Sequence, residues 1–151
     1  MVTVYVILGD TNMKKSSTVR ALTGVGQKKE FEIATNSGNL KVFTLISALQ
    51  ESEISPEKFI DFVKKGGYQN VLIPLWISGR KRGNFPSGNE YLQEFMKANW
   101  HIEHIVILGG HDLPNHTVLP DGVSAPLFIS NSNQQPANRI ASQIRGEWGW
   151  F

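Results

Sequence analysis

The sequence has no cysteine among its 151 residues, so disulfide bonds and thiolate metal sites are excluded. It has no marked excess of charge either. Its 15 basic and 13 acidic side chains give a net charge of +2, which does not by itself favour nucleic acid or a membrane surface as a partner. Long apolar runs are also missing, since no stretch approaches the roughly 20 residues of a membrane-spanning helix. We therefore expect a soluble cytoplasmic protein that does not contact membranes.

What is present is the composition of an ordinary globular protein, with 40% hydrophobic and 19% charged residues. A chain of this length can bury one sizeable core, and no repeat or change in composition divides it. The apolar run at residues 2–8 has no basic segment before it and ends at Gly9, so it predicts a buried strand and not a signal peptide. We expect a single domain over residues 1–151.

Strand-like and helix-like segments alternate along the rest of the chain. Apolar runs predict strands, and amphipathic segments that begin near serine or proline predict helices. The expected order is strand 2–8, helix 16–22, strands 31–35 and 41–47, a helix from residue 55, strand 70–78, helix 89–100, strands 104–110 and 125–130, and helix 135–148. The turn at 36–39 predicts an antiparallel hairpin, and Pro74 predicts a local distortion inside its strand.

This alternation predicts an α/β fold. We expect a three-layer sandwich with a mostly parallel sheet, helices on both faces and one antiparallel hairpin strand. Ligands of such sheets bind at the carboxyl ends of the strands. The loops that follow residues 8, 47, 78, 108 and 130 are therefore the places to search for a site.

The loop after the first strand resembles a phosphate-binding loop. That motif, G-x-x-x-x-G-K-[ST], lies between a strand and a helix. Gly9, Lys15 and Ser16 match three of its four fixed positions, whereas Lys14 stands where the second glycine belongs. Glycine there allows a tight bend and a close approach to phosphate, so Lys14 could force a different loop.

The chemistry of this loop suits an anion. Backbone N–H groups would surround a phosphate, the Lys15 ammonium would neutralise it, and the Ser16 hydroxyl would bind Mg²⁺. The binding residues that we expect here are Gly9, Asp10, Asn12, Met13, Lys14, Lys15, Ser16 and Ser17. Two lysines at a helix N-terminus oppose the helix dipole, and an anionic ligand would remove that conflict. The alternative is a solvated lysine pair on a helix capped by Asn12 or a nearby hydroxyl.

The stretch GDTNMKKSSTVRALTG resembles the first motif of the translation-factor-like and Ras-like small GTPases, within the P-loop NTPase superfamily. The order of strands and helices resembles this family over nearly the whole chain, and the sequence does so over residues 4–24. The resemblance implies a ligand such as GTP or GDP, or ATP, with Mg²⁺ held through Ser16. The later motifs are degenerate: residues 47–51 lack D-x-x-G, and of N-K-x-D only Asp112 is kept, where it would contact the base.

The resemblance thus implies a degenerate GTPase-like domain that binds phosphate or nucleotide, with weak or no hydrolysis. Gln50 and Glu51 are unorthodox candidates for positioning a water molecule, and a solvated loop is the alternative for both. One rival function is a pseudo-GTPase that acts as a protein-interaction module without nucleotide. Another is a small P-loop kinase or NTPase with Arg80 and Arg82 as lid residues. Whether the protein is an enzyme stays open, and no catalytic residue is assigned.

Two further groups of residues have alternative interpretations. The cluster Arg80-Lys81-Arg82 could bind nucleic acid, but three charges are too few to favour that partner. The C-terminal Trp148, Trp150 and Phe151 either pack under the sheet or form a surface for self-association or a protein partner.

The chain also contains four histidines, two of them close together. His101 and His104 have a spacing compatible with zinc, but no cysteine or acidic residue completes an obvious ligand set. We expect them to form a surface pair.

Overall fold

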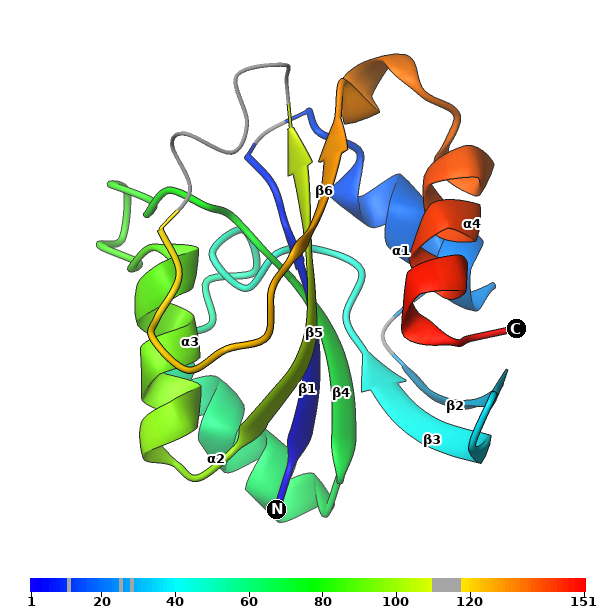
Figure 1. Ribbon diagram of the computed structural model, residues 1–151. Helices are drawn as coiled ribbons and strands as arrows, with labels where there is room; N and C mark the ends of the chain where they lie inside the picture. Colours follow the sequence, from blue (N-terminus) through cyan, green and yellow to red (C-terminus); the bar gives the residue numbers. More distant parts are fainter. Residues whose placement is uncertain (11, 25, 28, 110–117) are drawn as a thin grey trace.

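The computed structural model describes residues 1–10, 12–24, 26–27, 29–109 and 118–151. Six strands form one sheet in the order β2-β3-β4-β1-β5-β6, with helices on both faces (Figure 1). The strands are β1 (Thr3–Leu8), β2 (Lys29–Thr35), β3 (Gly38–Thr44), β4 (Asn70–Leu75), β5 (His101–Gly109) and β6 (Leu127–Ser130), and the helices are α1 (Lys15–Thr23), α2 (Pro56–Gly66), α3 (Gly88–Lys97) and α4 (Ala137–Trp148), with a 3-10 turn η1 (Ser132–Gln134). The predicted order of elements is confirmed.

The pairing of the strands agrees with the predicted fold class. β1 lies between β4 and β5 and is parallel to both, and the pairs β3–β4 and β5–β6 are also parallel. β2 runs antiparallel to β3, with Thr35 opposite Gly38, so the predicted hairpin is present with a shorter loop. The α/β sandwich with one antiparallel strand is therefore confirmed.

The sheet separates two hydrophobic cores. Val4, Val6 and Leu8 of β1 pack under α2 and α3, whereas Tyr5 and Ile7 pack under α1 and α4. Both faces of the central strand are thus buried, which explains its continuous apolar run. None of the described helices is long and apolar enough to cross a membrane.

Pro74 does not distort β4 where it pairs with β1. Ile7 lies opposite Pro74 without a shift in register. On the other side of β4, the ladder with β3 ends at the pair Thr44–Leu72, and beyond it the Leu49 N–H donates to the Pro74 carbonyl at 3.3 Å. The N–H that proline lacks falls on this side, where regular pairing has already stopped. β3 and β4 each end three residues earlier than predicted.

The C-terminal residues pack against the sheet. Trp148 and Trp150 are buried, and only Phe151 is well exposed, at 71%. The Phe151 N–H donates to the Ala34 carbonyl at 2.8 Å, and Trp150 forms an antiparallel bridge with Thr35. Packing under the sheet is therefore confirmed for the two tryptophans, and an interaction surface at the C-terminal residues stays a prediction.

Candidate functional site

The candidate loop lies where the sheet changes the direction of its connections. β1 leads through residues 9–14 into α1 on one face, whereas the neighbouring β4 leads through residues 76–87 into α3 on the opposite face (Figure 1). In open α/β sheets, ligands bind in the crevice that such a change creates at the carboxyl ends of the strands. The predicted phosphate loop therefore borders the expected ligand crevice.

Lys14 forms the bend of the backbone just before α1. Its φ of 67° and ψ of 29° lie in the left-handed region, which favours glycine. A non-glycine residue there costs roughly 1–2 kcal/mol. The Lys14 side chain reaches the segment before α4, where Nζ donates to the backbone carbonyl of Gln135. Lys14 thus takes the place of glycine while the loop retains its bend.

Lys15 is buried inside the loop, with 5% of its surface exposed. Its Nζ donates to the backbone carbonyl of Asp10 at 2.9 Å, so the side chain folds back over the loop that precedes it. Burial lowers the pKa of Lys15, and the carboxylates of Glu51 and Asp10 partly oppose that shift. An added anion would favour the charged ammonium further.

The atoms packed around Gly9 leave little room for a side chain. A Cβ atom at this position would lie 3.1 Å from the Leu108 carbonyl oxygen and 3.3 Å from both Met13 Cβ and Lys15 Cγ. The first of these atoms belongs to the backbone of the neighbouring β5 and cannot move independently. Glycine at position 9 therefore lets β1 turn into the loop beside β5.

Neighbouring segments brace the loop. The Asp10 carboxylate accepts the N–H of Ser78 at 3.0 Å and its hydroxyl at 3.4 Å, which ties the loop to the segment after β4. The buried Ser132 hydroxyl donates to the Met13 carbonyl at 3.0 Å. With the Lys14 contact, two segments distant in sequence hold the loop, one after β4 and one before α4. The sequence did not single out Ser78 or Gln135; the only hint was that Ser78 ends a predicted strand.

The N-terminus of α1 differs from those of α2 and α3. Ser55 and Ser87 cap the latter two with side-chain oxygens, and each has a glutamate in its first turn. α1 has neither a side-chain cap nor an acid in its first turn. Among the described residues, no side chain therefore caps α1, and the start of this helix suits an anion.

Gln50 is a structural residue. It is fully buried, and its Nε2 donates to the carbonyls of Trp76 and Pro86, both at 3.2 Å, while Oε1 accepts the Trp76 N–H at 3.0 Å. Both interpretations from sequence, a water-positioning group and a solvated side chain, are therefore wrong for Gln50. Glu51 is exposed and accepts the Trp76 indole N–H at 2.7 Å.

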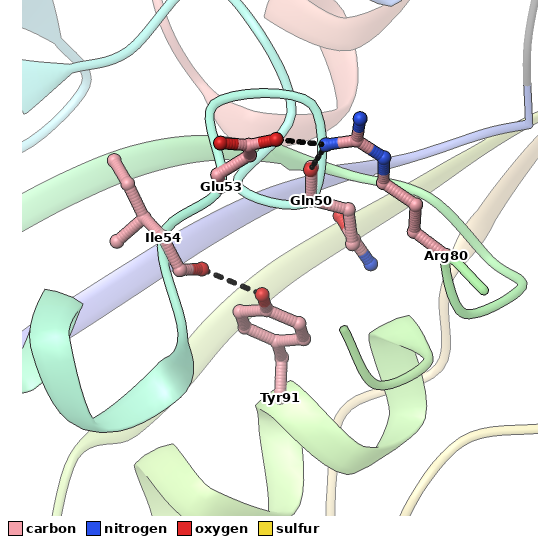
Figure 2. Close-up of polar contacts among 5 residues, drawn as sticks. All are labelled: Gln50, Glu53, Ile54, Arg80 and Tyr91. Carbon is pink, nitrogen blue, oxygen red and sulfur yellow. Dashed lines mark hydrogen bonds and ion pairs between the residues drawn. The ribbon is translucent and has the colours of Figure 1, made fainter. Parts of the chain in front are cut away.

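Arg80 joins the loop after β4 to the turn after β3. Figure 2 shows its guanidinium reaching the Gln50 carbonyl at 2.9 Å and the Glu53 carboxylate at 3.4 Å. In the same view, the Tyr91 hydroxyl from α3 donates to the Ile54 carbonyl at 2.6 Å. Arg80 thus fastens two loops together, which argues against its predicted role as a mobile lid. Arg82 lies exposed in the adjoining turn.

The described residues offer few ligands for a metal. Ser16 is half-buried in the first turn of α1. No group of three or more acidic or histidine side chains in the described part of the chain could hold an ion. Mg²⁺ commonly keeps several waters and binds through phosphate oxygens, so Ser16 fits an ion that arrives with a phosphate. Asp112, the predicted base contact, lies outside the described residues.

The central strand is thus followed by a loop with Lys14 at the second glycine position, a buried motif lysine and a helix whose N-cap residue makes no side-chain cap. The fold is an α/β sandwich with this loop at the carboxyl end of β1. No family model and no curated protein matches the sequence. Among solved structures, the chain is similar to the FeoB G-domain from Methanococcus jannaschii, with 20% identity and a TM-score of 0.47 over 95% of this chain and 96% of that one.

Proposed function

We propose that residues 1–151 form a single domain that binds the phosphate groups of a nucleotide, GTP or GDP first and ATP second, together with Mg²⁺. The observation that supports this most directly is the pairing of a left-handed Lys14 with a buried Lys15 whose ammonium faces the Asp10 carbonyl. A phosphate would take the place of that carbonyl as the partner of Lys15. Backbone N–H groups at the start of α1 would supply the remaining donors.

Weak or absent hydrolysis is part of the same proposal. The amide of Gln50 is used by three backbone groups, and the guanidinium of Arg80 is held by Gln50 and Glu53. Neither is free to orient water or to stabilise charge that develops on a transferring phosphoryl group. Ser16 would hold Mg²⁺, which would screen the phosphates of the bound nucleotide.

Thermal denaturation and calorimetry with a panel of phosphates test this function. GTP, GDP, ATP, ADP and inorganic phosphate are each added with and without Mg²⁺ to the wild type, to Lys15→Ala and to Lys14→Gly. A ligand present at 100 times its Kd stabilises the folded state by about 2.7 kcal/mol. We expect stabilisation in the wild type and in Lys14→Gly, and its loss in Lys15→Ala.

If no compound stabilises the wild type at millimolar concentration, nucleotide binding is excluded. The pseudo-GTPase alternative would then lead, because the segments pinned by Gln50 and Arg80 present a fixed surface at the crevice. If stabilisation is equal in Lys15→Ala, the ligand binds elsewhere on the protein.

A further inference from the structure

Apart from the crevice beside the candidate loop, a small cavity lies on the α1/α4 face of the sheet, beside the amino-terminal half of β1. Its volume is about 180 Å³, and it is bounded by the hairpin turn at 35–37, the start of β5 and the end of α4. Four aromatic residues line it, Tyr5, His104, Trp148 and Trp150, together with Glu103. Among the described residues, no lysine or arginine lines this cavity.

A β-bulge brings Glu103 to this cavity. In the pairing of β5 with β1, Ile102 lies opposite Val4 and His104 lies opposite Tyr5, so Glu103 is an additional residue. Ile102 and Ile105 on either side both belong to the core under α2 and α3. Glu103 and His104 therefore both face the α1/α4 side, which a regular strand would not allow for adjacent residues.

The aromatic rings are held at fixed angles. The Trp148 and Trp150 rings are 5.0 Å apart and nearly perpendicular at 75°, and Tyr5 lies 5.0 Å from Trp150 at 60°. His104 stacks on Trp148 with an interplanar angle of 11°. His104 is half-buried. The prediction that His104 forms a surface pair with His101 is therefore wrong for His104. The contacts between these rings hold them in one arrangement at the wall of the cavity.

Gly149 allows the backbone to turn after α4 and to place Trp150 beside Trp148. It has a φ of 70°, and a Cβ atom there would lie 2.6 Å from Asn36 Nδ2. Its carbonyl accepts the Asn36 N–H at 2.9 Å, so α4 ends and Trp150 returns beneath the sheet. The cavity wall is therefore built by two segments that are distant in sequence.

The charge around the cavity is negative. Glu103 is partly exposed and contacts His101 Nε2 at 2.6 Å. Burial, followed by the charge of Glu103, raises the pKa of Tyr5 to about 12, so Tyr5 stays neutral. Burial also lowers the pKa of His104, against the opposing charges of Glu103 and Glu147 and with a smaller lowering effect from His101. The rings are thus uncharged at neutral pH, and the carboxylates dominate.

We propose that this cavity binds an alkylated ammonium group, through the aromatic faces of Tyr5, Trp148 and Trp150 and the carboxylate of Glu103. Aromatic faces attract cations through their quadrupoles, and tryptophan does so most strongly. Pockets for drug-sized ligands commonly occupy roughly 300–1,000 Å³, so a cavity this small admits only a compact group. The same chemistry is offered by a free small cation and by a methylated lysine side chain.

A matched pair of probes isolates the charge. Choline and 3,3-dimethylbutan-1-ol have the same shape, but only choline carries a quaternary ammonium. We titrate each at pH 7.5 and constant ionic strength and follow the ¹H–¹⁵N indole signals of the four tryptophans. We expect choline to shift the signals of Trp148 and Trp150, but not those of Trp76 and Trp100, with about tenfold tighter binding than the neutral alcohol.

Variants and a second probe complete the test. Glu103→Gln should weaken choline binding severalfold without affecting the neutral alcohol, whereas Glu57→Gln on α2 should change neither. Equal binding of the two probes, equal affinity in Glu103→Gln, or no shift up to about 100 mM choline would each overturn the proposal.

A peptide with trimethyl-lysine is compared with choline: tighter binding of the peptide assigns a side chain as the ligand, and tighter binding of choline assigns a free cation.

Discussion

The ammonium of Lys15 lies 2.9 Å from the backbone carbonyl of Asp10, so the motif lysine closes on its own loop. This contact joins the two ends of the segment that would surround a phosphate. Because the lysine is already buried, an anion would replace one oxygen partner by another and would not need to desolvate the ammonium afresh.

We expect phosphate binding to raise the pKa of Lys15. Burial lowers this pKa in the protein, and a bound anion favours the charged form. The ¹⁵Nζ signal of Lys15 is titrated with and without inorganic phosphate, GDP and Mg²⁺. The signal of the exposed Lys64 provides the control and should not respond. Titration of Lys15 that is identical in all samples would contradict its contact with the ligand.

The backbone at position 14 predicts different stabilities for two small residues. Lys14→Gly and Lys14→Ala both remove the contact with Gln135, but only alanine must still occupy the left-handed region. We expect the glycine variant to be more stable than the alanine variant by roughly 1 kcal/mol. Urea unfolding of both proteins measures this difference. Equal stabilities would show that residue 14 does not keep a positive φ.

Gly9→Ala should be harmful both to the fold and to the site. The added methyl group would press on the Leu108 carbonyl, so we expect a loss of about 1–3 kcal/mol in the free energy of unfolding. Gly26→Ala is the matched control, because nothing lies within 4 Å of its added Cβ atom. A Gly9→Ala protein as stable as Gly26→Ala would show that β1 and β5 can separate at this point.

Gln50→Leu tests the structural role of the buried amide. The substitution leaves two carbonyls and one N–H without their side-chain partner, so we expect a loss of about 2–4 kcal/mol in the free energy of unfolding. Glu51→Gln, which changes an exposed neighbour, should alter stability by less than about 0.5 kcal/mol. Chemical denaturation measures both. A stable Gln50→Leu protein that had lost only turnover would instead support a role in positioning water.

His104 should make stability depend on pH in the mildly acidic range. Because burial lowers its pKa below 6.5, the unfolded chain takes up this proton more readily than the folded protein does. Its contribution to stability is complete above pH 6.5 and falls as the pH decreases toward the lowered folded-state pKa. We expect His104→Gln to flatten this part of the profile, as measured by urea unfolding between pH 5 and 7. An unchanged slope would show that other groups dominate it.

The features that sequence predicted well are local ones. The helix cap at Ser55, the two-stranded hairpin and the strand, loop and helix around Gly9 each depend on a few adjacent residues. Lys14 was the main uncertainty in the motif. Its side chain contacts Gln135, which is 121 residues away, and no local pattern predicts that contact.

The features that sequence missed depend on partners far along the chain. Gln50 looks like a solvated loop residue until Trp76 and Pro86 are placed beside it. The bulge at Glu103 arises only from the pairing of β5 with β1, and it puts His104 on an unexpected face. No periodicity within 101–109 reveals such a shift, because the pairing partner sets it.

The pairing of residues 149–151 with β2 has a consequence for solubility. β2 is the outermost strand on its side of the sheet, and unpaired backbone groups on such strands are templates for aggregation. The contacts of Gly149 and Phe151 with Asn36 and Ala34 use part of this edge within the molecule. Residues 149–151 thus occupy backbone groups of this edge, which makes the sheet harder to extend by another chain.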